Sequence, residues 1–553
     1  MTTAGMAQAL RAFWSVDRGR RLLSLLLALF VASWLLATLR STGITDDDDF
    51  YAPAGIAYVE HLGRMLTGDR EAYTRAGVDR AYSRNKEHPP LAKWAMGLSY
   101  TVLHRWTNVL PGLDAARAGV VALAAILAFL LASFVHAWRG PVAATAAVLA
   151  LFCMPRFFFH SHVATLDVPV ATLYFATCYA FWRGRSSRFW ALASGPVFGL
   201  ALLTKLNAPF ALIPIVLFLA LERWRQVRRS DGATLVLPAV PLSLLSMVIA
   251  GPLVFVALWP HLWFDSFQRI GAYVAFHLNH YPIYLYYLGH IYEKPFAPWH
   301  APFVLAWATT PLVLVAAAAA GLLGLRGLSR FLRSGADEEG ARALFVLLNL
   351  AVTIGVVAFL GAPKYGGVKL FLPFFPFVAA LVGVGVDTMA RALVQQWPRL
   401  AVRASLLPVA IAVIVIVPAA VATSSSHPFG LSYYGAGIGG LRGATAIGFE
   451  RQYYDVADKE LAAWLDANAP KGATLHFEPN NKEYVKTYRW LARDGYLRPD
   501  LRVVDQDSAD LYVLVHERRW ASYPELLARS ARRTVAYEKR VDGVALYTVF
   551  RAR

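Results

Sequence analysis

Four consecutive aspartates, Asp46 to Asp49, are the residues whose type and spacing point most directly to chemistry. Adjacent carboxylates repel one another, so the pKa of at least one of them is raised, and a carboxylate with a raised pKa suits a general base. A solvent-exposed charged segment or a patch that binds a divalent cation would have the same composition. The run is therefore a candidate catalytic site in which the residues alone favour no particular aspartate.

Several cations stand where an anionic substrate could be held. Arg117 begins a long apolar stretch, and Lys364 and Lys369 flank a Gly-Gly turn between two others. Cations at a membrane boundary beside flexible backbone can make charge-assisted hydrogen bonds to the phosphate of a lipid-borne substrate. The alternative for each is snorkelling, in which a long side chain reaches the lipid head groups. Lys205, near the turn of a predicted helical hairpin, has the same two interpretations.

The elements that must position these residues are membrane spans. The chain has 553 residues, 57% hydrophobic residues and a mean hydropathy of +0.44, so it is too apolar for a soluble protein and too long for one span. A helix needs ~20 apolar residues to cross the hydrocarbon. Roughly twelve stretches qualify, near residues 21–39, 91–106, 116–137, 141–157, 166–182, 188–205, 208–222, 235–259, 302–325, 343–361, 370–390 and 404–423.

The basic residues indicate membrane topology rather than binding to nucleic acid. The net charge is +18, but these residues form short clusters between apolar stretches, such as Arg183/Arg185/Arg188 and Arg391/Arg399/Arg403. Such clusters stay in the cytoplasm. We therefore expect a multi-pass protein of the bacterial inner membrane with its N-terminus inside.

One apolar stretch must fail to cross the membrane. Between Thr45, outside, and Arg183, inside, the chain must cross an odd number of times, yet four stretches lie between them. Residues 91–106 follow His88-Pro89-Pro90 and include charged residues, so we predict that they form an interfacial helix. About eleven spans of ~20 residues remain, with residues 40–115 as the first outer loop. Residues 424–553 are more polar and predict a small α/β domain on the outer side, after a membrane domain of residues 1–423.

Residues 20–425 resemble the GT-C glycosyltransferases, specifically the protein O-mannosyltransferases (glycosyltransferase family 39) and their bacterial relatives. The resemblance rests on several motifs in a shared order: Asp46-Asp47 before Phe50, His88-Pro89-Pro90-Leu91-Ala92-Lys93, Arg117 at the start of the next span, Ser161 to Pro169, Gly199 to Lys205, and Lys364 to Pro373.

The resemblance implies an inverting enzyme that transfers a sugar, mannose in that family, from a polyprenyl phosphate to a hydroxyl acceptor on the outer face of the membrane. Asp46 and Asp47 match the family's acidic pair and would deprotonate the acceptor, with the register open by a residue or two. The donor phosphate would be held by Arg117, Lys364 and Lys369. Further candidate substrate contacts are His88, Asp167 and Lys205.

The expected partners are a polyprenyl-phosphate-linked sugar, membrane lipids and a protein, lipid or glycan acceptor. The family's mannosyltransferases look independent of metal, so we expect no cofactor. Other GT-C enzymes use a divalent ion between outer-loop carboxylates, here Asp47 and Asp167, which is the less favoured arrangement.

Two departures keep alternatives open. Residues 262–300 are too short for the β-trefoil insert of the eukaryotic members, and a C-terminal domain is present instead. These differences allow a lipid or glycan acceptor, including amino-sugar transfer to a lipid A-like molecule. A secondary transporter is the alternative from another class, but it would place ionisable groups in broken helices at mid-membrane rather than at the outer boundary.

Overall fold

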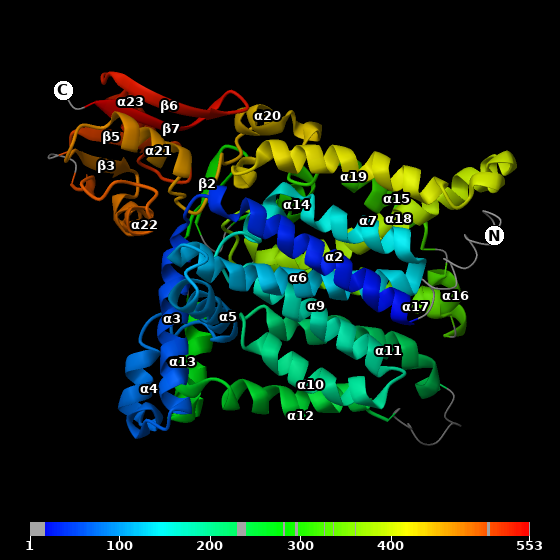
Figure 1. The fold of residues 1–553 in the computed structure, drawn as a ribbon. Helices are drawn as coiled ribbons and strands as arrows, with labels where there is room; N and C mark the ends of the chain where they lie inside the picture. The colour runs from blue at the N-terminus through cyan, green and yellow to red at the C-terminus, as the bar shows by residue number, and fades with distance from the viewer. Residues whose placement is uncertain are drawn as a thin grey trace.

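The computed structural model describes residues 17–228, 239–279, 283–293, 297–325, 327–335, 337–359, 361–505 and 509–551. Residues 1–16, predicted to be cytoplasmic, lie outside this part. The described chain is a bundle of helices with a small β-sheet unit near the C-terminus (Figure 1). The predicted fold class, a polytopic helical protein with a small C-terminal α/β unit, is confirmed.

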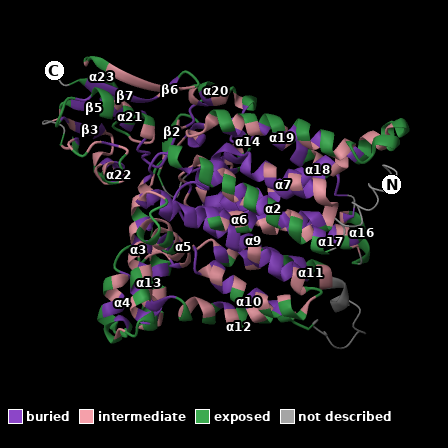
Figure 2. Ribbon diagram, in the orientation of Figure 1, coloured by how far each residue is buried: buried purple, intermediate pink, exposed green. Residues whose placement is uncertain are grey.

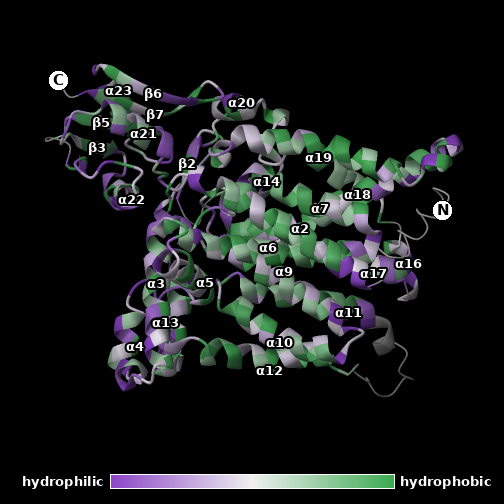
Figure 3. Cartoon of the chain, in the orientation of Figure 1, coloured by the Kyte–Doolittle hydropathy of each residue, from purple (hydrophilic) through white to green (hydrophobic). Residues whose placement is uncertain are grey.

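Six helical segments of the described chain are long and apolar enough to cross a membrane: Asp17–Ser41, Gly112–Arg139, Leu312–Ser334, Glu338–Ala358, Lys369–Gln396 and Leu407–Ser426. Shorter apolar helices are Pro141–Phe152, Arg188–Leu202 and Leu242–Ala257. Figure 2 shows that the middle of the bundle is buried, and Figure 3 shows hydrophobic residues along it with hydrophilic residues gathered at its two ends. This pattern is that of a multi-pass protein, and the number of eleven crossings stays a prediction.

The bundle is made of α2 (Asp17–Thr38), α6 (Gly112–Arg139), α7 (Pro141–Phe152), α8 (Pro155–His160), α9 (Asp167–Gly184), α10 (Arg188–Leu202), α11 (Leu212–Arg228), α12 (Leu242–Ala257), α14 (Ala301–Ala308), α15 (Leu312–Leu323), α16 (Leu328–Ser334), α17 (Glu338–Ala358), α18 (Phe375–Gln396) and α19 (Leu407–Ser426). Several predicted spans are broken by proline. The stretch 302–325, for example, divides into α14 and α15 before Pro311, because proline cannot donate the backbone hydrogen bond that would continue a helix.

A layer of helices covers one end of the bundle. Helices α3 (Asp46–Leu66), α4 (Arg75–Ala81) and α13 (Ser266–Leu278) run across this end (Figure 1), and α5 (Leu91–Tyr100) packs between α3 and α6. A Cβ atom on Gly55 would lie 2.2 Å from the carbonyl oxygen of Lys93, so the backbones of α3 and α5 touch where they cross. The predicted non-crossing segment 91–106 is absent from the candidate spans of the described chain.

The C-terminal unit lies at the same end of the bundle as α3 (Figure 1). Its five-stranded sheet has the order β4-β3-β5-β7-β6, in which β3 runs parallel to β4 and β5 while β7 is antiparallel to β5 and β6. Its elements are α20 (Gly440–Ala446), α21 (Lys459–Asn468), β3 (Thr474–Glu478), α22 (Asn481–Arg493), β4 (Arg502–Val503), β5 (Leu511–Val515), α23 (Tyr523–Ser530), β6 (Val535–Val541) and β7 (Val544–Arg551). A separate hairpin pairs β1 (Leu285–Tyr287) with β2 (His290–Tyr292). The domain boundary near residue 423 stays a prediction.

Candidate active site

The four aspartates form the first turn of α3 and have different surroundings. Asp48 and Thr45 form a capping box, because the Thr45 side chain accepts from the Asp48 amide and the Asp48 carboxylate accepts from the Thr45 amide. Acidic residues are stabilised at this position by the helix dipole. At 3.6 residues per turn, successive side chains point about 100° apart. Asp46 and Asp47 line a cavity, whereas the Asp49 carboxylate accepts a 2.8 Å hydrogen bond from the Trp490 indole of the C-terminal unit.

Asp48 is paired with Arg117 in the interior. The guanidinium donates to both carboxylate oxygens, at 3.0 and 2.6 Å, and neither side chain is exposed. Arg117 also donates to the carbonyl oxygens of Thr42 and Gly43. Since Arg117 does not line the cavity, its position does not support the predicted role in binding the donor phosphate. Its contacts hold the turn that leads into α3.

The cavity has a volume of about 400 Å³. It lies where α3, the loop before α5, the loops that carry Lys205 and Lys369, and the C-terminal unit meet. Of the predicted residues, Asp46, Asp47, His88, Lys205 and Lys369 line it. Its lining comprises Asp46, Asp47, Phe50, Tyr51, Asn85, Glu87, His88, Lys205, Phe276, Ile283, Tyr284, Tyr365, Gly366, Lys369, Tyr453, Tyr454, Asp455, Asn480, Glu483, Arg519 and Trp520.

Two lysines alternate with carboxylates along one wall. The Lys369 ammonium lies 3.4 Å from Asp47 Oδ2, and the Lys205 ammonium donates to Asp167 Oδ1 at 2.6 Å. Tyr454 joins the two pairs, because its hydroxyl donates to Asp167 Oδ2 at 2.8 Å while the Lys369 ammonium lies 4.4 Å from its ring centroid. Asp167, predicted as a weaker substrate contact, thus positions Lys205 and Tyr454.

The C-terminal unit contributes to this site, which sequence reasoning missed. The backbone amide of Asp46 donates to the carbonyl oxygen of Tyr454 at 3.2 Å. Arg519 lines the cavity and donates to Asp455 at 2.9 Å and to Glu517 at 2.7 Å. The only local signal was the aromatic pair before Asp455, and nothing in the sequence singles out Arg519. Residues of the C-terminal unit therefore form part of the cavity lining.

The motif around His88 forms another wall. The buried Lys93 ammonium donates to the carbonyl oxygens of Asn85, at 2.7 Å, and His88, at 2.8 Å, and lies 3.2 Å from the Tyr58 hydroxyl. It therefore holds residues 85–88 against α3. The polar run that precedes the two prolines is explained by this contact, since its backbone carbonyls satisfy a buried cation.

The loop before α18 brings Lys369 to the cavity and leaves Lys364 outside. The Lys364 ammonium donates to the carbonyl oxygens of Phe359, at 2.8 Å, and Ala362, at 3.2 Å. A Cβ atom on Gly367, whose φ is +58°, would lie 2.3 Å from the Tyr453 ring, so glycine is required where the two segments meet. The position of Lys364 does not support a role in phosphate binding.

The two cavity carboxylates hold their protons more tightly than usual. Burial, and next the charge of Asp47, raise the pKa of Asp46 well above its ordinary value. Burial also raises the pKa of Asp47, although the neighbouring Lys369 opposes this shift. The repulsion between adjacent aspartates, predicted from the sequence, contributes to the raised pKa of Asp46, but burial is the larger cause. Both groups are therefore suited to accept a proton.

Among the described residues, no group of three or more His, Cys, Asp or Glu side chains is placed to hold a metal ion. The predicted independence of metal stays a prediction, as do the roles assigned to the individual site residues. The geometry groups a carboxylate pair with Lys205, Lys369 and Arg519 around one cavity.

Residues 87–250 match the family described as dolichyl-phosphate-mannose-protein mannosyltransferase. This match covers the His88, Asp167 and Lys205 motifs and confirms the resemblance stated above. The match covers less than half of the chain, so it shows what this segment is similar to.

The solved structures with similar chains include the following three. ArnT from Cupriavidus metallidurans in the apo state is 15% identical, with 96% of this chain and 98% of that chain covered and a TM-score of 0.48. The same protein bound to undecaprenyl phosphate is 16% identical, with 97% and 98% covered and a TM-score of 0.47. The Archaeoglobus fulgidus oligosaccharyltransferase tethered with an acceptor peptide is 12% identical, with 88% and 64% covered and a TM-score of 0.42. No curated protein sequence matches the chain.

Proposed function

We propose that the protein is an inverting glycosyltransferase that moves a hexose, mannose in the first instance, from a polyprenyl phosphate to an acceptor hydroxyl. The observation that carries this proposal is that Asp46, Asp47, Lys205 and Lys369 line one cavity. A base and a phosphate-binding group must lie on either side of the reacting sugar carbon, and this cavity supplies both. The family match over residues 87–250 supports mannose.

The transfer balances without a further reactant. Asp46 or Asp47 takes the proton of the acceptor hydroxyl as its oxygen bonds to the anomeric carbon. The bond from that carbon to the donor phosphate breaks through an oxocarbenium-like state, and the polyprenyl phosphate leaves with the electron pair. Lys369 and Lys205 stabilise the leaving phosphate by charge-assisted hydrogen bonds. Because phosphate leaves as a stable anion, no general acid is needed.

The cavity is proposed to open on the outer side of the membrane. It lies at the end of the bundle that carries α3 and the C-terminal unit, whereas Arg185 pairs with Glu222 and Glu338 at the opposite end, where α17 begins. Basic residues collect on the cytoplasmic side of membrane proteins. By this rule, the cavity and the C-terminal unit face away from the cytoplasm of a bacterial inner membrane.

The test is release of free polyprenyl phosphate by the purified full-length protein from a panel of polyprenyl-phosphate sugars, including mannose and an amino sugar. The reaction is supplied with an extract of envelope acceptors, with and without chelator. We expect release from one donor that requires an acceptor and continues in chelator. Absence of release from every donor, together with transport of a labelled solute by the reconstituted protein, would favour the transporter alternative instead.

Replacing Lys369 with alanine is expected to lower kcat/KM for the lipid-linked donor by about 10- to 100-fold. The reason is that a hydrogen bond to a charged group contributes about 1.5–3 kcal/mol. The measurement is the initial rate against donor concentration. Lys364→Ala is the matched control, because that ammonium binds backbone carbonyls outside the cavity. Equal losses in the two variants would count against phosphate binding by Lys369.

As the pH is lowered, the transfer rate is expected to fall. The midpoint of this fall should lie at a higher pH than it would for a base with the ordinary aspartate pKa. The base works only when ionised, and burial raises the pKa of both Asp46 and Asp47. As pH drops through these raised values, the carboxylates take up protons and the rate is lost. The measurement is kcat against pH at saturating donor. A rate that stays constant down to about pH 4, near the ordinary aspartate pKa, would exclude these groups as the base.

A further inference from the structure

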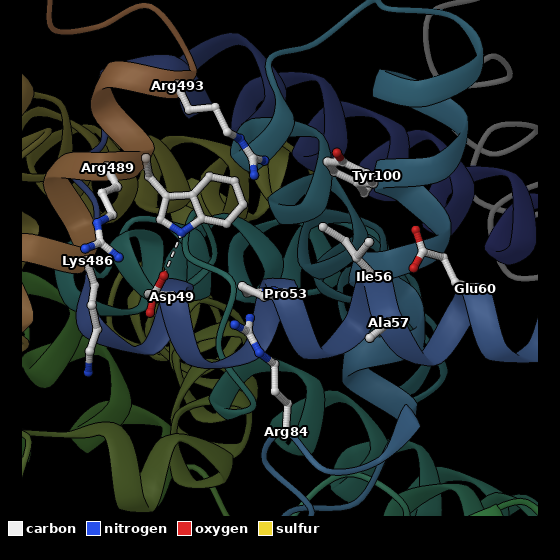
Figure 4. A pocket seen from close by; sticks show the side chains of 11 residues that line it. Asp49, Pro53, Ile56, Ala57, Glu60, Arg84, Tyr100, Lys486, Arg489 and Arg493 are labelled. Atoms are coloured by element: carbon white, nitrogen blue, oxygen red, sulfur yellow. Dashed lines mark hydrogen bonds between the residues drawn. The ribbon is translucent and has the colours of Figure 1, made fainter. Parts of the chain in front are cut away.

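A second cleft, of about 620 Å³, lies between α3 and α22 beside the catalytic cavity. Four cations reach it from two sides. In Figure 4, Lys486, Arg489 and Arg493 project from α22 toward α3, and Arg84 approaches from the loop on the other side of α3. The three α22 residues are three, four and seven positions apart, so they share one face of the helix.

Two of the four cations have acidic neighbours, because Lys486 pairs with Glu483 at 2.9 Å and Arg493 lies 3.7 Å from Asp494. Of the two carboxylates that line the cleft, Glu60 pairs with Arg105 at 2.6 Å and Asp49 accepts a hydrogen bond from the Trp490 indole. Arg84 and Arg489 are exposed, and within the described residues no ion pair involves either of them. The cleft therefore presents two guanidinium groups whose donors are available to an anion.

Apolar side chains form the rest of the lining. Pro53, Ile56 and Ala57 of α3 face Tyr100 and Trp490 across the cleft. The Arg493 guanidinium already lies 3.9 Å from the centroid of the buried Trp490 ring, so the aromatic surface left for the ring face of an acidic sugar is that of Tyr100. A cleft of this composition is less suited to a neutral peptide, which would leave the arginines without a partner.

The cleft and the catalytic cavity share a wall. Phe50 lines the cavity, and the Lys486 ammonium of the cleft lies 5.0 Å from the centroid of its ring. Glu483 also lines the cavity and pairs with Lys486 at 2.9 Å. A molecule bound in the cleft would thus be separated from the catalytic cavity only by side chains such as Phe50 and Glu483.

We propose that this cleft binds a phosphate or carboxylate group on the sugar part of the acceptor and thereby directs a neighbouring hydroxyl toward Asp46 and Asp47. The identification of the anion with the acceptor rests on the proposed function. The cleft makes the acceptor an acidic glycan, and it gives the C-terminal unit the role of selecting that acceptor through α22.

The binding test compares methyl glucoside with methyl glucoside 6-phosphate on the full-length protein in phosphatidylcholine nanodiscs, by saturation-transfer NMR titration. The variant is Arg84→Gln/Arg489→Gln. The control is Lys471→Gln/Arg502→Gln, which removes the same charge from exposed positions of the C-terminal unit away from the cleft. We expect the 6-phosphate to bind at least about tenfold more tightly to the native protein and to the control, and to lose this advantage in the variant.

Equal phosphate advantages in the variant and the control would overturn the proposal, because the catalytic lysines alone would then account for the binding. Disappearance of the advantage when phosphatidylglycerol is added to the nanodiscs would also overturn it, since a bilayer head group would then be the occupant. Neither result depends on sugar transfer, so failure of the proposed function would be recognised separately. With an active donor, the variant should raise KM for the acidic acceptor and leave KM for the donor unchanged.

Discussion

Replacing both Asp46 and Asp47 with asparagine is expected to reduce sugar transfer by about 10²- to 10⁴-fold, the range typical of a lost general base. Both carboxylates line the cavity, and the structure offers no third carboxylate on the first turn of α3 that could substitute, because Asp48 and Asp49 are directed elsewhere. Asparagine keeps the size of the side chain but cannot accept the proton. The measurement is kcat for acceptor-dependent release of polyprenyl phosphate.

The two single variants then identify the base. If one single variant loses nearly as much transfer activity as the double variant, the aspartate replaced in it is the base. The other aspartate then acts through its charge. Binding of the polyprenyl phosphate should remain measurable in all three, since the cationic wall is intact. Asp265→Asn is the control, because that carboxylate pairs with Arg75 and does not line the cavity. Full transfer by the double variant would remove both aspartates from the mechanism.

Part of the cavity lining was predictable from the sequence, at positions where a local sequence pattern marks a charged residue near the membrane boundary. The aspartate run and Lys369 stand beside span boundaries, and boundaries follow from hydropathy. The His88 motif instead precedes the short helix predicted not to cross the membrane. Such a pattern says that a charge lies at the membrane surface. It does not say which way the side chain points, and for that reason the sequence could not separate Arg117 and Lys364, which face the protein interior and a backbone turn, from Lys369.

The contribution of the C-terminal unit could not be predicted for a different reason. Tyr454 and Arg519 are separated from Asp46 by more than four hundred positions in the chain, and their contact depends on how a soluble unit docks against helices. The periodicity of apolar residues in the sequence does not indicate how the two parts dock. Its physical cause is visible only in the structure, where the Asp46 amide donates to the Tyr454 carbonyl and the Trp490 indole donates to Asp49.

Asp48→Asn is expected to lower the free energy of unfolding by about 3–5 kcal/mol, as is found when one partner of a buried ion pair is removed. The Arg117 guanidinium would remain fully buried, with Asp114, 3.6 Å away, as the remaining acidic partner. Thermal unfolding of the purified protein in detergent measures the loss. Asp49→Asn is the matched control from the same helical turn, because its amide oxygen can still accept the hydrogen bond from Trp490.

A double-mutant cycle measures the interaction energy between Asp48 and Arg117 separately from the contacts that each makes with other groups. Asp48→Asn/Arg117→Met removes both charges, so its loss should be smaller than the sum of the two single losses. An Asp48→Asn protein as stable as Asp49→Asn would contradict the structural role. The decisive comparison is between neighbours. The Asp46 and Asp47 variants should lose transfer with a smaller fall in melting temperature than Asp48→Asn, because Lys369 is less deeply buried than Arg117 and also interacts with Asp167. Asp48→Asn should lose stability before any effect on chemistry can be measured. Two opposite outcomes from adjacent, chemically identical side chains would follow from the rotation of α3, which directs one pair to the cavity and Asp48 to Arg117.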